Sequence, residues 1–271
     1  MKIINLVENN SGDNGCLFEH GLSFYLETDK HKILMDTGAS DAIIANAKIL
    51  NIELNRVDTV VLSHGHYDHS GGILPFVSLN DRAKIYLQEK AGEDYYSITN
   101  GISKYIGIDK RILKLPQLVK VKDLLIIDDE LVIFSKIANK KYWPNANRRL
   151  KKIENGQLVQ DNFEHEQCLV VKENNKSYLF SGCGHNGIIN ILTRYQNLFN
   201  QLPDVVISGF HMVKKDGYLD EDIQMIQDIA YKLAKLPTVF YTGHCTGQFA
   251  FDIMKSIMKD QLHQLYSGMK I

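Results

Sequence analysis

Short apolar runs recur along the chain, and each is bounded by glycine or by polar residues. Runs of four to eight apolar residues are typical of β-strands, and continuous ones are typical of strands that are buried on both faces. We expect strands at residues 2–8, 22–27, 32–35, 57–62, 83–88, 168–171, 178–183, 204–208 and 239–242, and hairpin-like strands over 123–135.

Other stretches place apolar residues three or four positions apart, which is the spacing of an amphipathic helix. From Asp220 to the break at Pro237, residues such as Ile223, Ile226 and Leu233 form one apolar face. Helices that follow strands predict an α/β fold, in which each sheet is covered by helices. We expect one domain over residues 1–271, made of two similar halves. The predicted helices span residues 39–50, 73–79, 186–199, 220–236 and 248–259.

Two long stretches lack a clear hydrophobic period. Residues 89–115 contain several tyrosines and glycines, and they could form either an aromatic lid over a pocket or a structural loop. Residues 136–162 are rich in lysine and arginine around Tyr142, Trp143 and Pro144, and they could hold an anionic substrate, with a phosphorylated one as an option. We favour a solvated surface loop for the second stretch, because runs of charged residues are usually solvated.

The strand predicted at residues 57–62 runs into a cluster of ionisable side chains, His64, His66, Asp68 and His69. A single histidine is usually a surface residue, but the chain has only 10 histidines, and three of them lie here within six positions. Imidazole nitrogens and carboxylate oxygens are ligands for zinc, manganese and iron. The spacing lets His64 and His66 point one way and Asp68 and His69 another, which predicts two metal ions side by side.

Other predicted strands also have ligand-capable residues at their ends. Because ligands bind at the ends of strands in sheets of this class, we expect these side chains to approach the histidine-rich loop. They are Asp36, Cys183, His185, His211, His244 and Cys245 after strands, and His165 before one.

The sequence from His64 to His69 resembles the metal-binding motif of the metallo-β-lactamase superfamily. Residues 32–38, 178–185 and 239–247 are similar to further motifs of that superfamily, so the resemblance covers nearly the whole chain. It implies a four-layer α/β/β/α sandwich with one or two metal ions at the edge of the two sheets. The pieces GCGHNG, GFHM and GHCTG are most similar to the branch related to the dihydropterin–ribofuranosylaminobenzene phosphate synthases of methanopterin biosynthesis.

The resemblance also implies roles for residues outside the histidine-rich loop. Asp36 would orient a ligand histidine, and Cys183 stands where related enzymes have a bridging Asp or Cys, although it could instead be a small buried residue. Many members have a ligand histidine at the place of His165, but this branch commonly has an acidic residue there. His211 is expected to contact the substrate or the transition state. Cys245 is expected beside the site, as a bridging residue or a neighbour of the ligands.

We expect two divalent metal ions, with zinc as the first choice and manganese or iron as alternatives. A hydroxide formed from a shared water would be the nucleophile. The expected function is a metal-dependent hydrolase of a small anionic or phosphorylated substrate, with a pterin-linked phosphate synthase activity as a finer alternative. A binuclear iron redox protein and a non-catalytic ligand sensor are further alternatives. The expected ligands are His64, His66 and His185 for one ion and Asp68, His69 and His244 for the other, and the expected catalytic residues are Asp68, Asp36 and His211.

Composition narrows the partners further. The formal net charge of -1 argues against a nucleic-acid-binding or membrane-surface protein, so a small molecule is the expected partner. The four cysteines form no Cys-x-x-Cys pair, and the N-terminus lacks the apolar core of a signal peptide, which favours the cytoplasm. His31 lies in a predicted turn, where we expect it to be exposed to solvent, and His263 is expected to have no catalytic role. None of these patterns predicts an oligomeric state.

Overall fold

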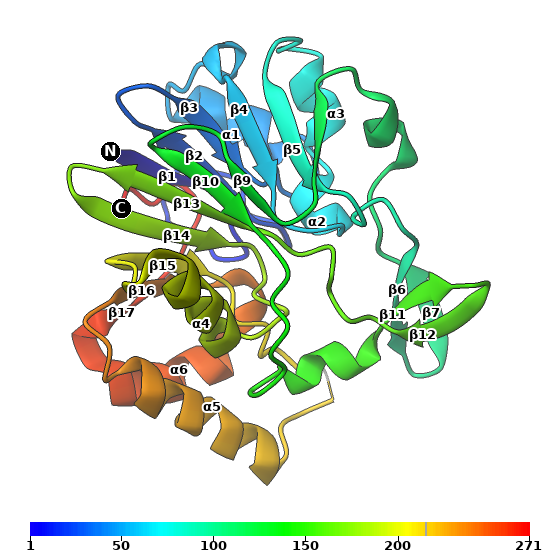
Figure 1. Cartoon of the computed structure of the whole chain (residues 1–271), viewed down its shortest axis with the longest axis vertical. Coiled ribbons are helices and arrows are strands. Elements are labelled where there is room, and N and C mark those ends of the chain that lie inside the picture. The colour runs from blue at the N-terminus through cyan, green and yellow to red at the C-terminus, as the bar shows by residue number, and fades with distance from the viewer. Residues whose placement is uncertain (215) are drawn as a thin grey trace.

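The computed structural model describes residues 1–214 and 216–271. Two large β-sheets lie face to face, and helices cover their outer faces (Figure 1). The first sheet contains β1 (Lys2–Val7), β2 (Ser23–Glu27), β3 (Lys32–Met35), β4 (Thr59–Leu62), β5 (Lys84–Gln88) and β8 (Leu118–Val121). The second contains β9 (Leu124–Ile126), β10 (Leu131–Phe134), β13 (Cys168–Glu173), β14 (Lys176–Ser181), β15 (Val205–Ser208), β16 (Val239–Thr242) and β17 (Leu262–Gln264).

The helices are short and follow the strands. The α-helices are α1 (Ala42–Ile49), α2 (Tyr67–Ser70), α3 (Ile73–Val77), α4 (Ile188–Phe199), α5 (Asp220–Leu233) and α6 (Gln248–Met258). The 3-10 helices are η1 (Leu54–Arg56), η2 (Lys110–Lys114), η3 (Asn145–Arg149), η4 (His244–Thr246) and η5 (Lys259–Gln261). No helix in the described ranges is both long enough and apolar enough to span a bilayer.

Each large sheet combines antiparallel strands with a parallel part. In the first sheet, β3, β4, β5 and β8 are parallel neighbours, and in the second sheet β14, β15, β16 and β17 are parallel neighbours. Parallel neighbours need a crossover connection, and α1, α4, α5 and α6 lie in these connections. The parallel strands of a sheet therefore all present their carboxyl ends at the same edge.

Alternate residues of the central strands enter different layers of the core. On β4, Val61 faces the space between the two sheets, whereas Val60 and Leu62 pack under α1 and α3. On β14, Phe180 enters the space between the sheets and Leu179 packs with α4, α5 and α6. Because both faces of these strands are buried, their sequences are continuous apolar runs. The predicted four-layer α/β/β/α sandwich is confirmed.

A third sheet, which the sequence did not predict, lies to the side of the sandwich (Figure 1). The stretches without a hydrophobic period supply all of its strands, and β11 pairs with β6 across more than fifty residues of chain. The interpretation of residues 136–162 as a solvated loop is therefore wrong for this part, since Lys152 is buried there. The strands are β6 (Tyr95–Thr99), β7 (Ile102–Tyr105), β11 (Leu150–Glu154) and β12 (Gln157–Gln160).

The expectation for His31 is also wrong. Its side chain is only 17% exposed, because Nδ1 lies 3.0 Å from Asp58 Oδ1 and Nε2 lies 2.6 Å from Asp128 Oδ2. Asp128 belongs to the turn between β9 and β10, about a hundred residues away in sequence. This turn covers the β2–β3 turn that carries His31. The local sequence around His31 did not indicate that contact.

Candidate metal centre

The carboxyl ends of strands from both large sheets meet at one place. Asp36 follows β3 and His64 follows β4, whereas Cys183, His211 and His244 follow β14, β15 and β16. All five residues are buried. The parallel arrangement brings the strand ends of each sheet to the same edge, and the packing of the sheets brings the two edges together.

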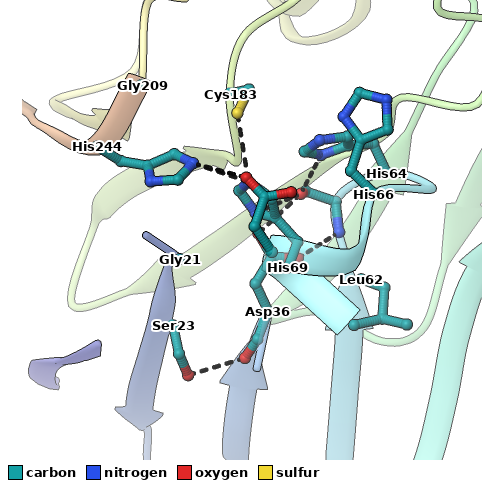
Figure 2. A network of polar contacts seen from close by, with 12 residues as sticks. Gly21, Ser23, Asp36, Leu62, His64, His66, His69, Cys183, Gly209 and His244 are labelled. Carbon is teal, nitrogen blue, oxygen red and sulfur yellow. Dashed lines mark hydrogen bonds and ion pairs between the residues drawn. The ribbon is translucent and has the colours of Figure 1, made fainter. Parts of the chain in front are cut away.

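A hydrogen-bond relay around Asp36 fixes two histidine rings (Figure 2). Asp36 Oδ1 accepts from the Ser63 backbone N–H at 2.6 Å, and Oδ2 accepts from Ser63 Oγ at 2.7 Å and from His69 Nδ1 at 2.7 Å. Since the Ser63 hydroxyl gives its proton to Asp36, its 2.8 Å contact with His64 Nδ1 is an N–H donation from the ring. The Nε2 atoms of neutral His64 and His69 therefore carry free lone pairs.

Two asparagines fix two further rings in the same way. Asn147 Nδ2 donates to the His185 carbonyl at 2.7 Å, so Asn147 Oδ1 is the acceptor that receives the His185 Nδ1–H at 2.9 Å. Asn9 Oδ1 lies 2.8 Å from His244 Nδ1 and also accepts from the Gly21 backbone N–H. In the neutral ring, each of these histidines also keeps its Nε2 lone pair for another partner.

The free Nε2 atoms converge. His69 Nε2 lies 3.2 Å from His244 Nε2 and 3.2 Å from Cys183 Sγ. Two nitrogens bound to one zinc ion at about 2.0–2.1 Å lie roughly 3.3 Å apart in a tetrahedral site. The donor atoms of His64, Cys183 and His185 form a second group in which all lie within 4.8 Å of one another. Cys183 therefore lies between two groups of histidines, and both groups fit a divalent cation.

Several ring nitrogens are buried without a hydrogen-bond partner in the part of the chain that the structure describes, which supports the same conclusion. An unpaired polar atom away from water is costly, so a cluster of them indicates a ligand that satisfies them together. Burial lowers the pKa of His64, His66 and His185, to about 3 for His66, and this keeps the rings in the neutral form that binds metals. The atoms are Nε2 of His64, His66 and His185, and both ring nitrogens of His211.

Asp68 supplies negative charge to the His244 side of the cluster. Its Oδ2 lies 3.3 Å from His244 Nε2, 3.8 Å from His69 Nε2 and 3.4 Å from His20 Nε2. Burial lowers the pKa of His244, but the hydrogen bond with Asp68 and the neighbouring Cys245 raise it to about 9. A positive charge at this place is therefore favoured, whether a proton or a metal ion carries it.

His66 and His165 lie on the other side of His64. The ring centroid of His66 is 4.5 Å from that of His64, but its donor atom lies within 4.8 Å of those of Asp161 and His165. His165 Nδ1 accepts from the Gly65 backbone N–H at 2.9 Å, and its Nε2 donates to Asp161 at 3.0 Å. Both nitrogens of His165 are thus used within the protein, and the residue supports the loop that carries His64 and His66.

His211 and Cys245 lie beside Cys183. The donor atoms of the three residues lie within 4.8 Å of one another, and Cys245 Sγ is 3.3 Å from the Cys183 carbonyl. His211 has a positive φ of 46°, and its ring is 4.1 Å from that of His185. The turn after β15 therefore places beside His185 an imidazole whose two nitrogens have no hydrogen-bond partner among the described residues.

The cluster lies in a cavity of about 300 Å³. Cys183, His185, His211 and His244 line one side of it. The cavity is also lined by residues of the third sheet, of the segment after β7 and of η3, namely Ser97, Lys104, Ile106, Arg149 and Leu150.

Comparison with known proteins places this site in a family. The family profile described as metallo-beta-lactamase superfamily matches residues 17–143. An uncharacterized protein of Methanocaldococcus jannaschii is 30% identical over 253 residues, which cover 90% of this chain and 91% of the relative. The chain belongs to the metallo-β-lactamase superfamily. Proteins of this superfamily generally bind divalent metals, in agreement with the His, Asp and Cys clusters described above.

Two more comparisons cover the whole length of this metallo-β-lactamase fold. A crystal structure described as a metal-dependent hydrolase of the beta-lactamase superfamily superposes with a TM-score of 0.83 at 30% identity, covering 100% of this chain and 98% of the other. A second protein of Methanocaldococcus jannaschii is 29% identical over an alignment of 296 residues, covering 99% of this chain and 95% of the relative. It is named 7,8-dihydropterin-6-methyl-4-(beta-D-ribofuranosyl)-aminobenzene-5'-phosphate synthase.

The sequence analysis did not identify the residues that hydrogen-bond to the histidines of this metallo-β-lactamase site and hold them in place. Asn9 and Asn147 come from a loop and from η3, far from the motifs, and nothing in their local sequence distinguishes them from other asparagines. Glu166 is a third case: it is buried and accepts from the backbone N–H of His185 at 2.6 Å and of Asn186 at 2.8 Å. An acidic residue next to a predicted strand could have indicated it, but its partners are defined by the fold.

Proposed function

We propose that the protein is a metal-dependent hydrolase that holds two divalent cations, with zinc as the first choice and manganese or iron as alternatives. The observation that carries the proposal is the convergence of His69 Nε2, His244 Nε2 and Cys183 Sγ at 3.2 Å contacts. Since the Nδ1 atoms of both histidines donate to other residues, their facing Nε2 atoms are placed to bind one cation between them once His244 gives up its Nε2 proton.

The proposed ligands fall into two sets that share Cys183. The first set contains His64 and His185, whose donor atoms lie in one group with Cys183. His66 is assigned to the same set because its buried Nε2 has no hydrogen-bond partner among the described residues. Asp68, His69 and His244 form the other set. Cys183 between them takes the place for which the sequence resemblance implied a bridging Asp or Cys, and a bound cation would offset the effect of burial, which raises the pKa of its thiol.

The bound cations would supply Lewis acidity and a source of hydroxide at neutral pH. The residues of the chain then have separate tasks. Asp36 keeps the proton of His69 on Nδ1 directly and that of His64 on Nδ1 through Ser63, so that both Nε2 atoms stay available. His211 offers an unpaired ring nitrogen inside the cavity, where it can hold a proton for a substrate oxygen that becomes negatively charged.

A small anionic or phosphorylated molecule is the proposed substrate. The cationic side chains of Lys104 and Arg149 on the cavity wall support it. A pterin-linked phosphate synthase activity is the second candidate, because the relative with that name matches 99% of this chain. The binuclear iron and sensor alternatives make different predictions for metal content and turnover.

The test begins with the metal. Protein purified without chelator is analysed by inductively coupled plasma mass spectrometry, stripped with chelator and reloaded with zinc, manganese or iron. Each form is assayed with phosphodiesters, thioesters and lactones. We expect about two cations per chain and turnover that is lost on stripping and restored on reloading. A chain that takes up no cation refutes the proposal, iron with a redox-active spectrum favours the iron alternative, and ligand binding without turnover favours a sensor.

A further inference from the structure

One row of side chains on the third sheet faces the metal-ligand cluster across the cavity. In the β-sheet register, Ser97 on β6 is paired with Lys104 on β7 and with Leu150 on β11. Directly paired residues of antiparallel strands project from the same face. Arg149 comes just before Leu150, and all four residues line the cavity that also holds His185 and His244.

The two cations of this row are not neutralised by the protein. Arg149 makes no ion pair or hydrogen bond with another residue of 1–214 or 216–271, and its Nε is buried. Lys104 lies on the exposed strand β7, and its ammonium lies 5.2 Å from the centroid of the Tyr67 ring. Arg148, the next residue, differs: it is exposed and lies 3.6 Å from Glu221. A half-buried guanidinium without an acceptor is costly, and it indicates an anionic ligand.

The row is also held at a fixed place relative to the metal ligands. The Tyr67 backbone N–H donates to the Ile106 carbonyl at 2.9 Å, and His66 forms a β-bridge with Gly107. The segment directly after the strand that carries Lys104 is thus hydrogen-bonded to His66 and to the first residue of α2, which carries Asp68. A substrate held by the row would have its other end beside the cluster.

We propose that Arg149, Lys104 and Ser97 bind a phosphate monoester group of the substrate, an inference that rests on the proposed function for the reaction at the other end of the cavity. A phosphate monoester carries up to two negative charges and three acceptor oxygens. Two cations and a hydroxyl match this group better than they match a carboxylate, which carries one charge and two oxygens. The guanidinium of Arg149 can donate two hydrogen bonds to the phosphate in a bidentate geometry, and Lys104 supplies a second positive charge.

The test uses the protein as purified, with the metal content matched between variants, so that any binding of anions to metal is the same in each. Phenyl phosphate and benzoate are titrated into the wild type, Arg149→Gln and Lys104→Gln by isothermal calorimetry. We expect the wild type to prefer phenyl phosphate, and each substitution to weaken that binding by about tenfold or more. Arg148→Gln is the matched control and is expected to bind phenyl phosphate like the wild type. Arg149→Lys keeps the positive charge but loses the paired N–H donors of the guanidinium. Its affinity for phenyl phosphate is expected to lie between those of the wild type and Arg149→Gln.

Three outcomes would overturn the inference: wild-type protein that binds no phenyl phosphate, equal binding by Arg149→Gln and the wild type, or equal affinity for benzoate. Circular dichroism of each variant establishes that it is folded, and Lys104→Gln provides an independent test if Arg149→Gln is not. Metal uptake is measured separately on the same preparations. A chain that binds phenyl phosphate but no cation would contradict the proposed function alone, and a chain that binds cations but not phenyl phosphate would contradict this inference alone.

Discussion

The Nε2 atoms of His69 and His244 lie 3.2 Å apart, although the two residues are 175 positions apart in the sequence. One follows a strand of the first sheet and the other follows a strand of the second sheet. The contact therefore exists only when the two sheets are packed together. A cation bound between these nitrogens would join the two halves of the sandwich, so its binding should be coupled to folding.

Replacing His244 by Gln tests this coupling. We expect the variant to lose roughly one cation per chain, because the second set keeps only His69, Asp68 and the shared Cys183. The thermal unfolding temperature of the metal-loaded protein should fall toward that of the stripped protein. Metal analysis and differential scanning calorimetry measure the two effects. The control is His263→Gln, since that ring stacks on Tyr241 at 4.7 Å on β16 and β17. Unchanged metal content in His244→Gln would contradict the assignment.

Asp36→Asn should weaken metal binding without removing a ligand. The Ser63 backbone N–H fixes the amide oxygen at one position, so the new NH₂ group would face Ser63 Oγ and His69 Nδ1, which are both donors. His69 would then place its proton on Nε2 and lose the lone pair there. We expect affinity for zinc to fall by about 10–100-fold, measured by competition with a chromophoric chelator.

The exposed Asp41→Asn, at the start of α1, is the control for this substitution, because it makes the same chemical change outside the cluster. Equal zinc affinity in Asp36→Asn and the wild type would show that the relay does not position the ring.

Cys183→Ser should remove the sulfur ligand that the two sets share. Cobalt substituted for zinc gives thiolate-to-metal absorption when sulfur is bound, so the wild type should show this band and Cys183→Ser should not. Cys168→Ser is the matched control, because Cys168 is buried in the layer between the second sheet and its helices. A band that persists in Cys183→Ser and disappears in Cys245→Ser would move the ligand role to Cys245.

His31 should make folding stability depend on pH. Burial lowers its pKa, but hydrogen bonds to Asp128 and Asp58 raise the pKa above the ordinary value of 6.5. A raised folded-state pKa means that the stabilisation is fully present below about pH 6.5 and is lost as the pH rises through the higher folded-state value. In His31→Gln, urea denaturation should show lower stability at acidic pH, and the difference from the wild type should shrink as the pH rises. A constant difference at all pH values would be inconsistent with this titration.

The sequence by itself determined the elements and their local chemistry. Apolar runs such as the one before His64 indicated strands that are buried on both faces, and the run of His64, His66, Asp68 and His69 indicated metal chemistry. These signals are local: a strand or helix is specified by the period of its own residues, and four ligand-capable residues within six positions are close together in any fold.

Other features depended on backbone pairing and packing between distant parts of the chain. β6 and β11 form the third sheet through hydrogen bonds between strands far apart in sequence, and their side chains show no clean alternation. The same sheet also places Arg149, which directly precedes β11, at the cavity, although its neighbour Arg148 is exposed to solvent.

Only the tertiary structure decided how the ligand-capable residues divide their tasks. His165 and His185 look equivalent in sequence, but both nitrogens of His165 are hydrogen-bonded within the protein, whereas Asn147 leaves His185 Nε2 free. Cys183 lies between two groups of histidines because the carboxyl ends of β4 and β14 meet across the sheets. The type of a side chain sets what it can bind, but the protons and lone pairs it presents depend on partners that only the folded chain brings within hydrogen-bond distance.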